Sequence, residues 1–184
     1  MPESHKPPCA MLVVMGVSAC GKSSVGAAVA ARLGWNYQEG DDFHPSANVE
    51  KMRAGIPLDD ADRQPWLAAI AEWMDVQAAS AQAGVVGCSA LKRKYRDFLR
   101  NGRPRVWFVY LRVSRAELQR RVATRHHEYM PASLLDSQLE TLQEPVADEP
   151  QTLTIDADGD VNANAAAVLR ALRAQGIVDV PTSG

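Results

Sequence analysis

The sequence has few cysteines, no long apolar run and no marked excess of either charge. Its three cysteines, Cys9, Cys20 and Cys88, lack the spacing of metal sites or redox pairs, so we expect reduced thiols in a cytoplasmic protein. The apolar runs are too short to cross a membrane, and the first residues contain no apolar segment typical of a signal peptide. With 20 Lys and Arg against 22 Asp and Glu, the composition favours neither nucleic-acid binding nor membrane-surface binding.

Several ligand motifs are also missing or incomplete. No N-K-x-D segment for guanine recognition occurs, which argues against a GTPase. The acidic stretch that begins at Asp156 starts like a calcium loop, but Val161 and Ala167 occupy the positions that need Gly and Glu. His126 and His127 have no further Cys or His nearby, so zinc is not expected. We also find no internal repeat, and 184 residues indicate one domain with room for a small lid.

One motif stands out from this background. Residues 16–23 read Gly-Val-Ser-Ala-Cys-Gly-Lys-Ser and fit G-x-x-x-x-G-K-[ST], the phosphate-binding P-loop. An apolar run precedes it and a small-residue helical pattern follows it, which is the strand–loop–helix context that the motif needs. Lys22 is predicted to reach the β- and γ-phosphates, and the Ser23 hydroxyl to bind Mg²⁺. The residues expected to bind ATP are Gly16, Val17, Ser18, Ala19, Cys20, Gly21, Lys22, Ser23 and Ser24.

Strand and helix patterns alternate along the chain. Strands are predicted at 11–15, 35–39, 85–88, 105–111 and 152–155, and helices at 22–33, 46–54, 59–80, 91–99, 114–125, 131–142 and 162–174. Five alternations predict an α/β fold with a five-stranded parallel sheet covered by helices on both faces. The domain is expected to span 10–176, with a lid at about 121–142 and loose tails at 1–9 and 177–184.

Charged residues follow the predicted strands, where ligands bind in such sheets. Asp41 comes directly after the second strand and is the preferred carboxylate for orienting or deprotonating an attacking hydroxyl; helix capping is the alternative. His44 is expected either to bind substrate or to fix the turn. Lys92 and Arg96 share a helix face after the third strand and are candidates for binding a substrate anion, unless that face is only solvated.

Two arginines near the predicted lid are candidates for stabilising the transferred phosphoryl group. Arg121 and Arg125 lie four residues apart and therefore share a helix face. Charge develops on the phosphoryl oxygens during transfer, and arginine can stabilise it. The alternative is a solubilising helix surface.

Beyond the P-loop, longer blocks of sequence resemble a known family. They are the stretches at 15–18, 40–45, 48–52, 55–58, 62–63, 65–67, 88–92, 95–97, 137–138 and 141–145. The chain resembles bacterial-type gluconokinases, small P-loop kinases with the nucleoside-monophosphate-kinase-like three-layer fold. The resemblance implies transfer of a phosphoryl group from ATP to D-gluconate with Mg²⁺, and a possible homodimer. The family usually has Gly-Ser where Ala19 and Cys20 stand and His where Glu128 stands.

Gluconate carries a carboxylate at the end opposite its reacting hydroxyl, and that carboxylate needs a cation. The candidates expected to contact the substrate are Asp41, His44, Lys51, Arg53, Lys92, Arg96 and, from the resemblance, Gln138. Arg96 is the preferred partner of the carboxylate. Two other functions are kept open: a shikimate-type kinase acting on another small metabolite, and a regulatory protein that binds ATP without turnover.

Overall fold

The computed structural model describes residues 10–124 and 133–179. In these residues the strands form one five-stranded sheet with the order β2-β3-β1-β4-β5, and every pairing is parallel. The strands are β1 (Met11–Met15), β2 (Asn36–Glu39), β3 (Gly84–Gly87), β4 (Val106–Arg112) and β5 (Thr152–Asp156). The predicted parallel sheet is therefore confirmed.

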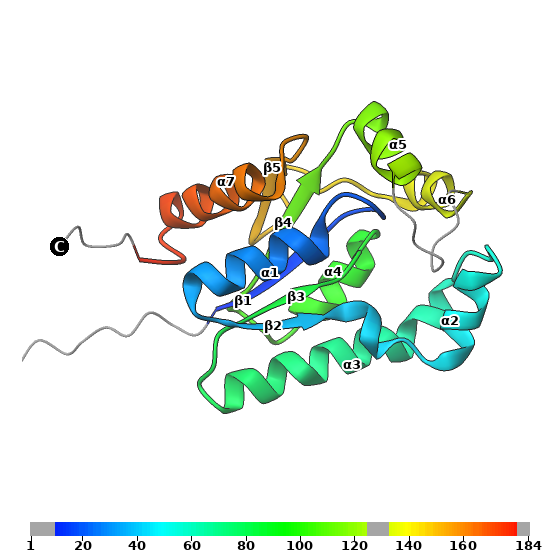
Figure 1. Cartoon of the computed structure of the whole chain (residues 1–184). Coiled ribbons are helices and arrows are strands. Elements are labelled where there is room, and N and C mark those ends of the chain that lie inside the picture. The colour runs from blue at the N-terminus through cyan, green and yellow to red at the C-terminus, as the bar shows by residue number, and fades with distance from the viewer. Residues whose placement is uncertain (1–9, 125–132, 180–184) are drawn as a thin grey trace, which may run out of the picture.

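Helices cover both faces of the sheet, and further helices lie at one of its ends (Figure 1). They are α1 (Lys22–Leu33), α2 (Ser46–Arg53), α3 (Asp60–Ala79), α4 (Arg93–Arg100), α5 (Arg115–Thr124), α6 (Ser133–Thr141) and α7 (Val161–Ala174), with a 3₁₀ turn, η1 (Gly40–Phe43), after β2. Figure 1 shows α2, α5 and α6 at the end where the strands terminate. The expected lid includes residues 125–132, which lie outside the described residues, so the lid stays a prediction.

The central strand β1 explains the three layers. Leu12 and Val14 pack with α1 and α7, whereas Met11, Val13 and Met15 pack with α3 and α4. All five side chains are at most 3% exposed, because successive residues of a strand point to opposite faces and both faces are covered. Burying one such side chain contributes about 1.5–3 kcal/mol relative to leaving it in water. The apolar run thus forms the middle of the core.

The end of β2 is held against the end of β3. A Cβ atom added to Gly40 would lie 2.0 Å from the carbonyl oxygen of Gly87, so only glycine fits at this contact. Trp66 of α3 donates its indole N–H to the Gly40 carbonyl at 2.8 Å. Helix α3 is itself fixed at its start by a capping box between Asp59 and Asp62. These contacts determine where Asp41, the next residue, enters the pocket.

In the described part of the chain, no helix is long and apolar enough to cross a bilayer.

Candidate active site

The P-loop closes around the start of α1. The Lys22 ammonium donates to the Val17 carbonyl at 3.0 Å, and Gln138 of α6 accepts a hydrogen bond of 2.7 Å from the Ser18 amide. Helix α6 therefore contacts the loop directly, 120 residues away in sequence. Cys20 is buried with no exposed surface, so its side chain supports the loop from inside.

Ala19 adopts a left-handed backbone conformation. Its φ angle is +67°, a region that glycine reaches without cost and that costs an L-residue with a Cβ about 1–2 kcal/mol. The family that the sequence resembles usually has glycine at this position. The loop keeps its shape in spite of the alanine, and Ala19 is almost fully buried.

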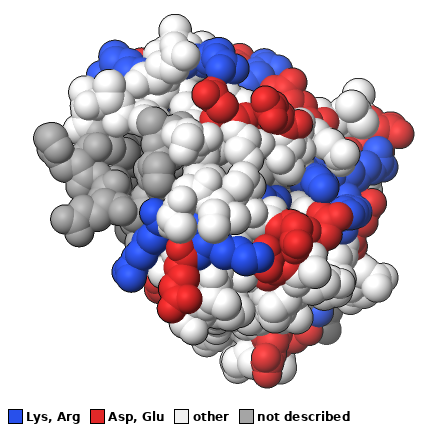
Figure 2. Space-filling view, turned by 90° about the vertical axis from the view of Figure 1, so that its right-hand side faces the viewer, with Lys and Arg blue, Asp and Glu red and all other residues white. Residues whose placement is uncertain are grey.

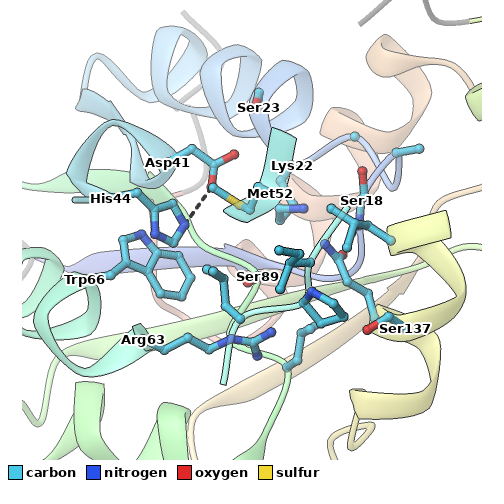
Figure 3. Close-up of a pocket in the computed structure, with 18 residues that line it drawn as sticks. Ser18, Lys22, Ser23, Asp41, His44, Met52, Arg63, Trp66, Ser89 and Ser137 are labelled. Atoms are coloured by element: carbon cyan, nitrogen blue, oxygen red, sulfur yellow. Dashed lines mark hydrogen bonds and ion pairs between the residues drawn. The ribbon is translucent and has the colours of Figure 1, made fainter. Parts of the chain in front are cut away.

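A pocket lies beyond the ends of β1, β2 and β3, and Figure 3 shows it. We call it the active-site pocket. Of the predicted residues it brings together Ser18, Ala19, Gly21, Lys22, Ser23, Asp41, His44 and Gln138. It also includes residues that were not predicted to act: Met52, Ile56, Pro57, Leu58, Arg63, Trp66, Ser89, Leu91, Leu134 and Ser137.

Asp41 presents its carboxylate to the pocket, and about half of the side chain (51%) is exposed. Partial burial raises the pKa of this carboxyl above its ordinary value of 3.8. The positive charge of Lys22 lowers the pKa, while Glu39 and Asp42 raise it further, and the net direction is upward. Asp41 therefore combines access to a ligand with an increased tendency to accept a proton.

Glu39, the last residue of β2, was missed by sequence reasoning. The Ser23 hydroxyl and the Tyr37 hydroxyl both donate to its carboxylate, the second at 2.9 Å. Two oxygen groups therefore meet beside the P-loop, the Ser23 hydroxyl and the Glu39 carboxylate. The position of Glu39 at a strand end, directly before Gly40-Asp41, is the sequence feature that could have identified it as a site residue.

Arg63 of α3 is the unpredicted cation of the pocket. Its side chain points into the pocket in Figure 3, and the residue is only 8% exposed. The guanidinium lies 5.3 Å from the centre of the Tyr95 ring. Among the described residues, no carboxylate lies within ion-pair distance of it. The resemblance to gluconokinases included Asp62-Arg63, but no role was assigned to it.

The other predicted cations do not line this pocket. Lys51 pairs with Asp62 at 2.8 Å, and Lys92 pairs with Asp60 at 3.0 Å. Arg53 is exposed in the last turn of α2. Of the basic residues that the sequence nominated for the substrate, His44 alone lines the pocket in the described part of the chain.

The assignment of Arg96 to the substrate is corrected by the structure. Arg96 has no exposed surface and forms a buried ion pair with Glu149, which is also buried. It also donates to the carbonyl oxygens of Ala90 at 2.8 Å and Gln143 at 2.9 Å. The sequence placed it on a helix face near a strand end, but the partner that draws it into the interior is 53 residues away.

Arg121 also differs from its predicted role. It lies behind the P-loop and donates to the carbonyl oxygens of Ala19, Cys20, Ala157 and Gly159, and to the Glu117 carboxylate. These contacts occupy all five of its N–H groups, so it is placed to hold the loop rather than to touch the transferred group. Arg125, its predicted companion, lies outside the described residues.

A second pocket adjoins the rear of the P-loop. Its lining includes Gly21, Ser24, Arg120, Arg121 and the loop between β5 and α7. Figure 2 shows the face of the molecule that lies on the right-hand side of Figure 1, where basic and acidic side chains are interspersed. Neither charge forms a continuous patch on that face.

Comparisons with known proteins show which family the chain belongs to. The shikimate kinase family model matches residues 18–173. A gluconokinase of Gluconobacter oxydans is 52% identical over 139 residues, covering 76% of this chain and 78% of that protein. A solved gluconokinase from Sinorhizobium meliloti is 44% identical with a TM-score of 0.81, covering 92% of this chain and 95% of the other. A shikimate kinase from Aquifex aeolicus, at 11% identity and a TM-score of 0.61, shares the fold. The chain therefore belongs to the gluconokinases, within the broader group of P-loop kinases that the shikimate kinase model describes.

Proposed function

We propose that this chain transfers the γ-phosphoryl group of ATP to the terminal hydroxyl of D-gluconate. Membership of the gluconokinases supports ATP as donor and gluconate as acceptor. The observation that carries the proposal is the presence of the P-loop, the Asp41 carboxylate and the Arg63 cation, which has no ion-pair partner among the described residues, in one pocket. These are the groups that a phosphoryl donor, a reacting hydroxyl and a substrate carboxylate require.

Arg63 is the proposed partner of the gluconate carboxylate. A buried charge without a counter-ion is costly, so an anionic ligand that pairs with it gains more than at the surface. The planar guanidinium also matches a carboxylate with two hydrogen bonds. Lys22, the other strongly basic side chain among the described residues that line the pocket, belongs to the phosphate loop.

Asp41 is the proposed base. Its carboxylate lines the same pocket as Lys22, so a hydroxyl between them meets a proton acceptor on one side and the phosphate loop on the other. The base removes the proton from the attacking oxygen as the bond to phosphorus forms, and ADP leaves. Lys22 stabilises the negative charge on the phosphate oxygens.

Mg²⁺ fits the two oxygen groups that meet beside the P-loop, one from the start of α1 and one from the end of β2. The Ser23 hydroxyl and the Glu39 carboxylate are hard ligands of the kind that this cation prefers. When bound, the cation neutralises charge on the nucleotide phosphates. The second pocket, at the rear of the loop, is the proposed place for the nucleoside part of ATP. A homodimer and a cytoplasmic location stay predictions.

The test is release of ADP in a coupled assay with gluconate, shikimate and other small hydroxy acids as acceptors. We expect turnover with gluconate and none in a Lys22→Ala variant. Preference for shikimate would instead favour the shikimate-type alternative. ATP binding with no turnover on any acceptor would favour the regulatory protein.

A further inference from the structure

His44 and Asn48 form a chain of polar contacts that leads to Asp41 and that the reaction described above does not use. Asn48 lies in α2 and is 4% exposed. Its side-chain nitrogen donates to the backbone carbonyl of Asp62 at 2.8 Å. A carbonyl oxygen can only accept, so this contact fixes which end of the Asn48 amide is nitrogen.

The same nitrogen lies 3.2 Å from Nδ1 of His44. Because the amide nitrogen is a donor, Nδ1 of His44 has to be the acceptor and cannot carry a proton. In the neutral imidazole the proton is then on Nε2. The orientation of one amide therefore determines the tautomer of the histidine.

The ring of His44 is also held in place and kept neutral. It stacks on Trp66 with centroids 4.4 Å apart and 13° between the planes, and its side chain is 4% exposed. Burial, with a further contribution from the positive charge of Arg63, lowers the pKa of His44 to about 4. Nε2 lies 3.7 Å from Oδ1 of Asp41, and Figure 3 shows the ring directed at that carboxylate.

We propose that Asn48 is a positioning residue that selects the Nε2–H tautomer of His44, so that a neutral donor faces one oxygen of the Asp41 carboxylate. The other oxygen of Asp41 is then left to accept the proton of the substrate hydroxyl. The opposite tautomer would place a nitrogen lone pair against the carboxylate, which is repulsive. This proposal rests on the proposed function, because it assigns His44 and Asn48 a role through Asp41.

The first test is an NMR measurement that does not depend on enzymatic activity. Nitrogen-15 NMR distinguishes protonated from unprotonated ring nitrogens, and the signal of His44 is identified by its loss in His44→Gln. We expect Nε2 protonated and Nδ1 unprotonated at neutral pH in the unmodified protein. A neutral ring protonated mainly on Nδ1 overturns the proposal. This result stands whether or not gluconate proves to be the substrate.

The second test is a double-mutant cycle. Asn48→Asp keeps the size of the side chain but replaces the donor by an acceptor, so it favours a proton on Nδ1. Loss of the N–H donor that faces the charged Asp41 carboxylate predicts a fall in kcat of about tenfold to a hundredfold, with KM for ATP little changed. In His44→Gln the side-chain amide nitrogen of Gln is always a donor, so Asn48 has no tautomer to select in that background. We therefore expect Asn48→Asp to cost less than about threefold in that background.

The two backgrounds separate positioning from general support. Asn48→Asp also removes the hydrogen bond to the Asp62 carbonyl, and that structural loss is the same with His or Gln at position 44. An equal fall in kcat in both backgrounds would therefore assign Asn48 to structure alone and overturn the proposal. If the unmodified protein does not phosphorylate gluconate, the proposed function fails, and the spectrum still decides the tautomer.

Discussion

At the scale of single residues, Arg63 takes the role that the position of Arg96 in the sequence favours. Arg96 follows a strand end but is buried against Glu149, whereas Arg63 lies in the middle of a turn of α3 and reaches the pocket. Both are almost fully buried. The difference is the counter-ion, which Arg96 has and Arg63 lacks among the described residues, and an unpaired cation is the one available to an anionic substrate.

Replacing Arg63 by Met tests this assignment. We expect KM for gluconate to rise about tenfold to a hundredfold, because a charge-assisted pair is lost, with little change in KM for ATP. Steady-state kinetics with each substrate varied in turn measures both values. Lys92→Met is the matched control, since Lys92 pairs with Asp60 outside the pocket, and its KM for gluconate should stay near that of the unmodified protein. A rise confined to ATP would contradict the assignment.

The raised pKa of Asp41 predicts where activity is lost in acid. A base must be ionised, so kcat/KM for gluconate falls as the pH drops through the pKa of Asp41, which lies above 3.8. Glu39→Gln removes one of the negative charges that raise this pKa and should move the acidic limb to lower pH, whatever its effect on the maximal rate. Asp42→Asn should move it in the same direction by less. Titration of the gluconate carboxyl is common to all three proteins, so an unmoved or raised limb in Glu39→Gln would count against Asp41 as the base.

At the scale of elements, a buried ion pair joins α4 to the connection between α6 and β5. Arg96 binds Glu149 and the carbonyl oxygens of Ala90 and Gln143, and Arg100 donates to the same Glu149 carboxylate at 3.1 Å. The β3–α4 loop next to the pocket is therefore tied to a segment some fifty residues later. Hydrogen bonds from both arginines hold the pKa of Glu149 below its ordinary value although burial opposes this.

Breaking this ion pair from one side is expected to destabilise the fold. Arg96→Met leaves a buried carboxylate short of its partner, and we expect the free energy of unfolding to fall by about 3–5 kcal/mol. The double variant Arg96→Met with Glu149→Leu should be more stable than Arg96→Met alone, because no unpaired charge remains. Urea denaturation of the three proteins measures both differences. A loss below about 1 kcal/mol in the single variant would show that the pair contributes little.

Elements formed by local patterns were predicted well, and contacts between distant segments were not. The predicted helix at 22–33 and the strand at 11–15 match α1 and β1, because apolar periodicity and the P-loop are encoded within a few residues. The roles of Arg63, Arg96 and Glu39 depend on which side chains the fold brings near them. The partners of Arg63 and Arg96 are 32 and 53 residues away, so no local pattern could show them. Glu39 differs, because its place at a strand end before Gly40-Asp41 is a local signal.

At the scale of the whole molecule, His44 links stability to pH. Its pKa is about 4 in the folded protein and about 6.5 when exposed. Between these values the unfolded chain binds more protons, so stability rises with pH across this window and is lost as pH falls from 6.5 toward 4. Carboxylates with lowered pKa values also make stability fall as the pH drops. The pKa of Glu117 is about 2 in the fold, so its contribution to stability is lost as the pH falls below its ordinary value of 4.5.

The variant His44→Gln isolates this contribution. Between pH 4.5 and 6.5 its free energy of unfolding should change less steeply with pH than that of the unmodified protein, whatever its absolute stability. Denaturant titrations at several pH values give the two slopes. Equal slopes would mean that His44 titrates in the fold as it does in water, with neither burial nor Arg63 affecting it.

Arg121 bears on the entropy of nucleotide binding. Its guanidinium joins the P-loop to the loop after β5 through hydrogen bonds within the chain. Fixing the backbone of one residue costs about 1–2 kcal/mol of conformational entropy, and here folding has already met that cost for the P-loop. ATP therefore encounters a preorganised loop, and more of its contact energy is available as affinity. A side chain that anchors the rear of the P-loop can in this way strengthen nucleotide binding.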